Sequence, residues 1–214
     1  MNKYSLYVVT DETLSNGRSH AQITREAVDG GAGAIQLRDK KMSSAKLYAA
    51  ALEMAEICKG RAIFIVNDRL DVALAAGADG VHLWQDDLPL KAARFLTPSD
   101  FIIGVSISSV DEALLAARDG ADYVAVSPVF GTESKFYDTQ AGCGLEMVSA
   151  VRRALPSDIP VIGIGGLSEN NIPQTISAGA DGIAVISAVV SSPDIKGAAE
   201  RLLNIIRRAK SDNQ

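Results

Sequence analysis

The stretch GADGIAVI at Gly179–Ile186 places a glycine-rich phrase directly before a short apolar run. Close copies of this arrangement begin at Gly31, Gly77 and Gly120, and each copy follows a helical pattern. The physical explanation is a glycine that ends a helix, then a tight turn and a buried parallel strand. The repeat therefore predicts that helices and strands alternate along the chain.

Further apolar runs lie between these copies and raise the number of predicted strands to eight. The strands are expected at Tyr4–Val9, Ile35–Leu37, Ala62–Val66, Val81–Leu83, Phe101–Val105, Tyr123–Val126, Pro160–Ile164 and Ile183–Ile186. Helical patterns separate nearly all of these strands, and they lie at Ser19–Asp29, Ser43–Lys59, Leu70–Ala76, Leu88–Leu96, Val110–Asp119, Gly144–Leu155 and Asn170–Ala178. A last helix is expected at Asp194–Ala209, after the eighth strand.

Strands and helices that alternate in this way form a parallel sheet, which is either doubly wound or closed into a barrel. Many units with short spacings favour closure, so the predicted fold class is α/β, a (β/α)8 TIM barrel. The length of 214 residues is near the lower end for such a barrel. We expect a single domain over residues 1–209 and a frayed tail over residues 210–214.

Composition limits the kinds of partner. The formal net charge of −5 argues against nucleic acid and against an anionic membrane surface, so a phosphate site needs a local cluster of cations. Cys58 and Cys143 cannot build a disulfide framework, and the sequence contains neither a signal-peptide core nor a membrane-length apolar stretch. We therefore expect a cytoplasmic protein without a membrane partner, and homo-oligomer formation stays open.

In a barrel the carboxyl ends of the strands carry the chemistry. The second predicted strand runs into Gln36-Leu37-Arg38-Asp39-Lys40. Alternation along a strand puts Gln36 and Arg38 on one face, and two cations beside an amide suit a polyanion such as pyrophosphate. The alternative is a solvated loop in which Arg38 and Asp39 neutralise each other.

Acidic residues follow the next two predicted strands. Asp68 comes after the third strand, and Asp87 comes after the fourth. Carboxylates at neighbouring strand ends can share one Mg²⁺ ion, which keeps its other positions for water and substrate oxygens. The alternative is that each aspartate caps the helix that follows it. His82, at the end of the fourth strand, is expected to hold the barrel mouth together by hydrogen bonding.

Later segments are candidates for phosphate binding. A long loop opens after the sixth strand and runs from Ser127 to about Gly142, and long loops in compact barrels are usually functional. Its Lys135 can reach an anion or cover the site; the alternative is a mobile surface loop. The turns Gly163–Gly166 and Val185–Ala188 end the last two strands, where barrels often bind phosphate through backbone N–H groups.

Taken together, these phrases resemble the thiamine phosphate synthase family along nearly the whole chain. The matching segments are Gln36–Lys40, Asn67–Arg69, Gly80–Leu83, Gln85–Pro89, Gly104–Ser106, Thr132–Lys135 and Gly163–Gly166. The resemblance implies a transferase that joins an aminopyrimidine carrying a methyl diphosphate to a thiazole phosphate, giving thiamine phosphate and pyrophosphate. It also implies a dissociative reaction assisted by Mg²⁺, with small phosphorylated molecules as partners.

The resemblance implies a role for each matching position. The expected pyrimidine diphosphate ligands are Gln36, Arg38, Lys40, Asn67, Ser106 and Lys135, of which Arg38, Lys40, Ser106 and Lys135 are the expected catalytic residues. Leu37 and Asp39, in the same segment, are also expected to bind substrate. The expected thiazole phosphate ligands are Thr132, Glu133, Ser134, Gly166, Ile186 and Ser187. Asp68 and Asp87 are the expected Mg²⁺ ligands.

The sequence departs from the family pattern at four positions. Trp84 and Ser127 stand where glycine is usual, Gly131 stands where proline is common, and Ser108 stands where histidine is frequent. These departures concern substrate fit rather than the fold. Two alternatives follow, namely the related thiazole tautomerase, which typically uses a histidine at the position of Ser108, and a non-catalytic barrel that binds thiamine precursors.

Overall fold

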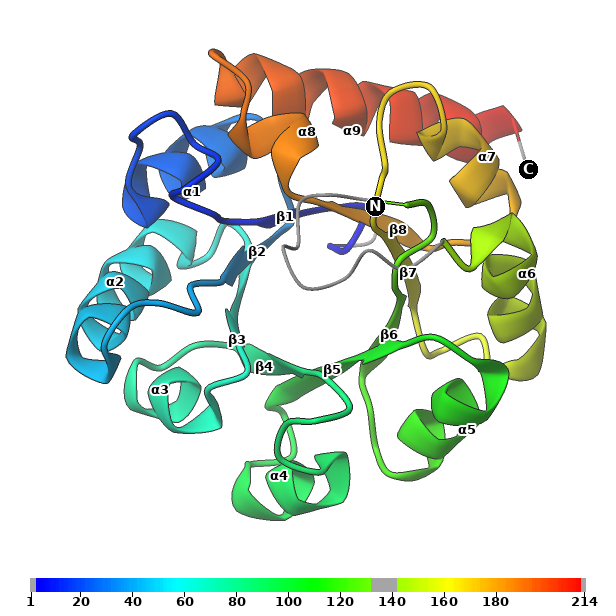
Figure 1. Cartoon of the computed structure of the whole chain (residues 1–214), viewed down its shortest axis with the longest axis horizontal. Helices are drawn as coiled ribbons and strands as arrows, with labels where there is room; N and C mark the ends of the chain where they lie inside the picture. The colour runs from blue at the N-terminus through cyan, green and yellow to red at the C-terminus, as the bar shows by residue number, and fades with distance from the viewer. Residues whose placement is uncertain (1–2, 132–141, 213–214) are drawn as a thin grey trace.

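The computed structural model describes residues 3–131 and 142–212, whose strands close into a barrel (Figure 1). Every neighbouring pair of strands is parallel, including the pair β1–β8 that closes the sheet. The strands are β1 (Leu6–Val9), β2 (Ala34–Leu37), β3 (Ile63–Asn67), β4 (Gly80–Leu83), β5 (Ile102–Ile107), β6 (Tyr123–Val126), β7 (Val161–Ile164) and β8 (Gly182–Val185). The predicted (β/α)8 barrel is confirmed.

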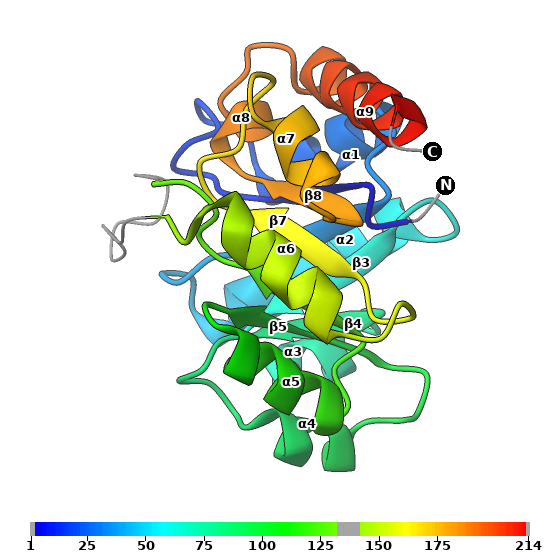
Figure 2. The same ribbon diagram turned by 90° about the vertical axis from the view of Figure 1, so that its right-hand side faces the viewer.

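The helices form a ring outside the strands (Figures 1 and 2). They are α1 (His20–Asp29), α2 (Ser44–Cys58), α3 (Leu70–Ala75), α4 (Leu90–Leu96), α5 (Val110–Arg118), α6 (Gly144–Ala154), α7 (Ile172–Ser177), α8 (Ser187–Val190) and α9 (Ile195–Asp212). The last helix packs against α1 and α7 and continues beyond the expected boundary at residue 209. None of the described helices is long and apolar enough to cross a membrane.

The repeated glycines end helices, as the sequence predicts. Gly31, Gly77, Gly120 and Gly179 each follow the capping residue of a helix and have φ angles of 89°, 67°, 97° and 107°. This left-handed conformation is readily adopted only by glycine and turns the chain from the helix into the next strand. The repeat is therefore a turn signal.

The aspartates of the repeat have a role that the sequence did not reveal. In three copies the carboxylate accepts a hydrogen bond from a backbone N–H near the start of the preceding strand. The three bonds are Phe64 N to Asp79 Oδ2 (2.7 Å), Ile103 N to Asp122 Oδ2 (2.7 Å) and Val161 N to Asp181 Oδ2 (2.9 Å). Each bond gives a partner to a backbone N–H group at the amino-terminal end of the barrel. It also connects that strand to the turn that precedes the next strand.

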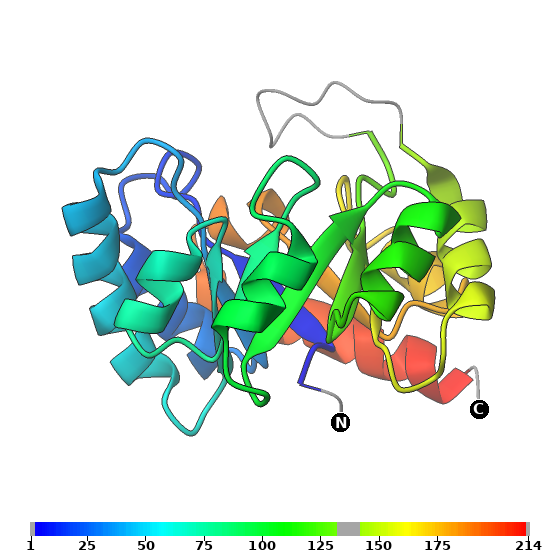
Figure 3. The same cartoon turned by 90° about the horizontal axis from the view of Figure 1, so that it is seen from below.

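Side chains of the strands alternate between two apolar layers. On β2, Ala34 belongs to the cluster inside the barrel, whereas Ile35 and Leu37 belong to the larger cluster between sheet and helices. Alternation therefore turns Gln36 into the barrel, as the sequence predicts. Figure 3 shows the turns that follow the strands gathered at one end, while β1 begins and α9 ends near the other.

The aspartate bonds predict a measurable stability difference. Asp181→Ala removes the acceptor for Val161 N and a partner of Arg152 Nη1 at 2.9 Å, so the free energy of unfolding should fall by about 1–3 kcal/mol. Urea denaturation checks this value. Glu169→Ala is the control, because its pair with Arg201 is half exposed and should contribute at most about 1 kcal/mol. Equal losses in both variants would contradict the role of Asp181.

Candidate active site

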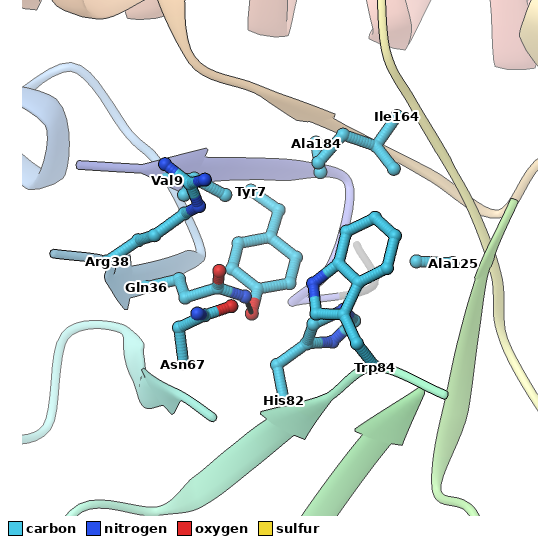
Figure 4. A pocket seen from close by; sticks show the side chains of 10 residues that line it. All are labelled: Tyr7, Val9, Gln36, Arg38, Asn67, His82, Trp84, Ala125, Ile164 and Ala184. Atoms are coloured by element: carbon cyan, nitrogen blue, oxygen red, sulfur yellow. Dashed lines mark hydrogen bonds between the residues drawn. The ribbon is translucent and has the colours of Figure 1, made fainter. Parts of the chain in front are cut away.

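Polar side chains gather inside the barrel at the carboxyl ends of the strands. Gln36, Asn67, His82 and Ser106 come from β2, β3, β4 and β5 and are all buried. Figure 4 shows a pocket lined by Tyr7, Val9, Gln36, Arg38, Asn67, His82, Trp84, Ala125, Ile164 and Ala184. The expected ligands Gln36, Arg38 and Asn67 thus meet in one place.

A chain of hydrogen bonds crosses the floor of this pocket, and we call it the buried hydrogen-bond chain. Gln36 Nε2 donates to Tyr7 Oη at 2.8 Å, and Tyr7 Oη lies 3.0 Å from Tyr123 Oη. His82 Nδ1 lies 2.9 Å from Tyr123 Oη, and His82 Nε2 lies 2.9 Å from Ser106 Oγ. The chain therefore joins Gln36 to Ser106 across the barrel, and His82 holds the mouth together as expected.

The donors in this chain have a consistent direction. One assignment that uses every contact starts from the Gln36 donation to Tyr7 and continues with Tyr7 donating to Tyr123, Tyr123 to His82 and His82 to Ser106. Burial raises the pKa of Tyr7 and of Tyr123 well above the usual value, so both hydroxyl groups keep their protons. In this direction Ser106 Oγ accepts from His82 and keeps its own hydrogen for a further acceptor.

The two tyrosines were missed by the sequence analysis. Tyr7 and Tyr123 lie 116 positions apart in the chain, and both are almost completely buried. Each occurs in an otherwise aliphatic strand. A buried tyrosine needs a partner for its hydroxyl group, so their presence was the available signal, but the sequence did not reveal that each partners the other.

Acidic and basic side chains meet beside this pocket. Lys40 Nζ lies 3.6 Å from Asp68 Oδ2, and Asp87 Oδ2 accepts a hydrogen bond from Trp84 N at 2.7 Å. Burial raises the pKa of Asp68 to about 6, and the nearby negative charge of Asp87 adds to the shift, whereas Lys40 opposes it. The two carboxylates are therefore close enough to repel each other, in a place where a cation would stabilise both.

The helix-capping alternative fails for both aspartates. The capping position of α3 is Arg69 and that of α4 is Pro89, and neither helix has a side-chain cap. Asp68 also has a φ angle of 61°, an uncommon conformation for a residue other than glycine. Such backbone strain is typical of functional sites.

Three buried atoms in this region have no hydrogen-bond partner among the described residues. They are Arg38 Nε, Asn67 Oδ1 and Asp68 Oδ1. Leaving such a group unpaired costs about 1–3 kcal/mol, and more for a charged group. Two oxygen acceptors and a guanidinium donor match a ligand that combines a cation with an anion. The residues present therefore fit Mg²⁺ and a phosphate group.

Two members of the Gln36–Lys40 segment face elsewhere. Leu37 packs in the layer between sheet and helices. Asp39 accepts hydrogen bonds from the backbone N–H groups of Lys41 and Met42, both at 2.7 Å, and lies 3.4 Å from His20 Nε2. Its side chain thus shapes the loop that carries Arg38 and Lys40.

Arg38 also has a protein partner that the sequence did not suggest. Its Nη1 lies 3.6 Å from Asp11 Oδ2, and both side chains are largely buried. The proposed neutralising pair of Arg38 with Asp39 does not appear among the ion pairs of the described residues. Asp11 instead positions the guanidinium group at the pocket.

The turns after β7 and β8 have the conformation needed for close approach. Gly165 and Gly166 have φ angles of 100° and 62°, and a side chain at Gly166 would press against Phe130. The short helix α8 begins at Ser187, directly after the buried Ile186. The expected ligands Thr132, Glu133, Ser134 and Lys135 lie outside the described residues.

Comparisons with known proteins agree with this geometry. A family model described as thiamine monophosphate synthase matches residues 6–189. The thiamine-phosphate synthase of Methanocella arvoryzae is 54% identical over 205 residues and 95% of both chains, and that of Methanoculleus marisnigri is 50% identical over 99% of both. The solved thiamine phosphate pyrophosphorylase of Pyrococcus furiosus is 38% identical, covers 97% of this chain and 98% of its own, and has a TM-score of 0.88. The chain therefore belongs to the thiamine monophosphate synthase family.

Proposed function

We propose that this protein joins an aminopyrimidine carrying a methyl diphosphate to a thiazole phosphate, forming thiamine phosphate and pyrophosphate. The main support for this proposal is that basic, acidic and amide side chains lie close together at or beside one buried pocket. These residues are Arg38, Lys40, Asn67, Asp68 and Asp87. Three buried atoms of this group have no hydrogen-bond partner within residues 3–131 and 142–212, and they suit a cation bound to a diphosphate. The names of the relatives support the same reaction.

The reaction breaks one bond and forms another at the same carbon atom. The methylene–oxygen bond breaks, and its electron pair leaves with pyrophosphate. The thiazole nitrogen then donates its lone pair to the methylene carbon and forms the new carbon–nitrogen bond. No proton transfer at this carbon is needed, so the protein has to orient two substrates and stabilise a leaving anion.

The proposed contacts of the pyrimidine diphosphate run from its ring to its phosphates. Gln36 and Ser106, at the two ends of the buried hydrogen-bond chain, are proposed to orient the aminopyrimidine ring. Arg38 and Lys40 are proposed to hold the diphosphate and to stabilise the charge that develops on it. In the other half of the mouth, Gly166, Ile186 and Ser187 are proposed to hold the thiazole phosphate through backbone N–H groups and the Ser187 hydroxyl group.

Asp68, Asp87 and the amide oxygen of Asn67 are the residues proposed to hold Mg²⁺. When bound, this ion supplies positive charge to the departing diphosphate oxygens. The Thr132–Lys135 segment is proposed to complete the phosphate contacts, as the family resemblance implies.

The tautomerase alternative receives no support from the position of Ser108. Ser108 is exposed, and its backbone N–H and hydroxyl group both donate to the Glu112 carboxylate. Ser108 is also absent from the residues that line the pocket in Figure 4. This position therefore offers no acid–base group to a bound thiazole.

The first test is a coupled product assay. Purified protein with Mg²⁺ and both substrates should release thiamine phosphate and pyrophosphate in equal amounts. Both products are measured together by chromatography, with heat-denatured protein as the control. If folded protein gives neither product, the synthase proposal is wrong, and isomerisation of the thiazole or binding alone remains.

The second test separates two adjacent lysines. Lys40→Ala should lower kcat/KM for the pyrimidine diphosphate by about 100-fold, because it removes a cation from the leaving group. Lys41→Ala is the matched control, since Lys41 is exposed and should change this ratio by less than about threefold. Steady-state kinetics measure both ratios, and equal effects would remove Lys40 from the diphosphate site.

The third test concerns the metal. Asp87→Asn should weaken Mg²⁺ binding in the presence of inorganic pyrophosphate by about tenfold or more, because a neutral amide is a poorer ligand than a carboxylate. Isothermal titration calorimetry measures the affinity. Asp86→Asn is the matched control, because Asp86 is an exposed neighbour with the same charge. An Asp87 variant that binds as tightly as the control would contradict the metal role.

A further inference from the structure

The turn that follows β1 holds the Gln36–Lys40 segment from one side. Thr10 N and Thr10 Oγ1 both donate to the backbone oxygen of Gln36, at 2.9 Å and 3.1 Å. Asp11 Oδ2 lies 3.6 Å from Arg38 Nη1. Neither Thr10 nor Asp11 lines the pocket in Figure 4. The position of the proposed diphosphate ligands therefore depends on residues that lie behind them.

His20, at the start of α1, makes a third contact with the same segment. Its side chain is buried, with 1% of its surface exposed. Its Nδ1 lies 2.7 Å from Thr10 Oγ1, and its Nε2 lies 3.4 Å from Asp39 Oδ2. Its backbone N–H donates to Glu12 Oε1 at 3.0 Å. The imidazole ring is thus held between the turn after β1 and the turn after β2.

The direction of the contact between His20 and Asp39 follows from the charge of Asp39. Burial alone would raise the pKa of the Asp39 carboxyl group, but hydrogen bonds from two backbone N–H groups and from His20 hold this pKa below its usual value. An ionised carboxylate only accepts hydrogen bonds, so His20 Nε2 carries a hydrogen. His20 Nδ1 can accept from the Thr10 hydroxyl group or donate to it, and Nε2 donates to Asp39 in both cases.

Glu12, His20 and Asp39 also have the composition of a metal site, since one ligand atom from each lies within 4.8 Å of the others. The hydrogen on His20 Nε2, however, uses the lone pair that a metal ion would need. Glu12 Oε1 and Asp39 Oδ1 already accept hydrogen bonds from backbone N–H groups. The arrangement is therefore a hydrogen-bonded support.

Asp39 connects this support to the proposed diphosphate ligands. It stands between Arg38 and Lys40 in the sequence. Its Oδ1 accepts from two backbone N–H groups of the turn after β2, both at 2.7 Å, while its Oδ2 faces His20. Rotation of this carboxylate would disturb the turn from which both cationic side chains extend. A donor on Oδ2 opposes that rotation.

We propose that His20 is a positioning residue for the pyrimidine diphosphate, which acts by donating a hydrogen bond to Asp39 and so fixes the turn that carries Arg38 and Lys40. The inference rests on the proposed function, because that function gives the two cations their role. His20 itself touches no substrate. A displacement of about 1 Å at a residue that binds the reacting group can lower a rate by about 100-fold, so a support behind the ligands affects turnover.

Two substitutions that differ by one CH₂ group test the donor. In His20→Gln the amide nitrogen can reach the place of Nε2 and still donate to Asp39, whereas in His20→Asn it reaches only the place of Nδ1. His20→Asn should weaken the binding of inorganic pyrophosphate with Mg²⁺ by about tenfold, and His20→Gln should stay within about threefold of wild type. Isothermal titration calorimetry measures the affinities. Equal losses in both variants, or no loss in either, would overturn the proposal.

Folding of these variants is checked by urea denaturation. The start of α1 is fixed by the capping box of Ser19 and Gln22, which uses no atom of the His20 side chain. Asp39→Ala supplies a second route, because Asp39 lies at the surface side of the contact and is 18% exposed. In the Asp39→Ala background, His20→Asn should weaken pyrophosphate binding by less than about threefold more. Effects that multiply in the double variant would show that His20 does not act through Asp39.

Steady-state kinetics separate positioning from a general loss of structure. His20→Asn should lower kcat/KM for the pyrimidine diphosphate by about tenfold and leave KM for the thiazole phosphate unchanged, because the proposed thiazole phosphate ligands follow β7 and β8. An equal rise of KM for both substrates would overturn the positioning role. Wild-type protein that forms no product contradicts the proposed function, whereas wild-type turnover with an unimpaired His20→Asn variant contradicts only this inference.

Discussion

Closure of the parallel sheet is the constraint on which the rest of the molecule depends. Pairing of β1 with β8 brings the carboxyl ends of all strands to one rim, although their residues are far apart in sequence. Side chains alternate along each strand, so a slip of one residue would turn Gln36 away from the barrel and Leu37 into it. The carboxylates of Asp79, Asp122 and Asp181, which bind strand N–H groups at the other end, oppose such a slip.

The rim concentrates charge in a protein that is acidic as a whole. The net charge is −5, yet Arg38 lines the pocket, and Lys40 lies 3.6 Å from Asp68 beside it. Burial of Asp68 near Asp87 is unfavourable in isolation, as the raised pKa of Asp68 indicates. A cation at the proposed metal site would relieve this repulsion, which is the physical reason for expecting one there.

Much of the fold could be predicted because its signals are local. In the repeated phrase, the glycine that ends a helix and the apolar strand that follows it lie within a few residues of each other. The repeat therefore predicts the alternation of helices and strands. The rim residues were also accessible, because strand ends and strand alternation identified Gln36, Arg38, Asp68 and Asp87. The roles proposed for these residues remain predictions that the experiments above can test.

Other features depend on contacts that the sequence does not contain. The partners Tyr7 and Tyr123 become neighbours only when the barrel closes. Aspartate adopts the left-handed conformation more often than most residues, but its residue type alone does not predict it at Asp68. Arg38 pairs with Asp11 rather than with Asp39, the pair that the sequence offered as the alternative to anion binding. The sequence also predicted the end of α9 too early, because Lys210 is held by tertiary contacts with Ser5 Oγ and the backbone oxygen of Asp181.

The buried hydrogen-bond chain has a consequence for molecular recognition. When each tyrosine hydroxyl donates one hydrogen bond and accepts one, the polarity at one end of the chain determines the polarity at the other. A half-turn of the Gln36 amide would present its oxygen to Tyr7, and with every contact reversed Ser106 would donate its hydrogen bond to the other tautomer of His82. The two ends of the pocket therefore change character together, and a ligand that matches one end imposes its own pattern of donors and acceptors on the opposite wall.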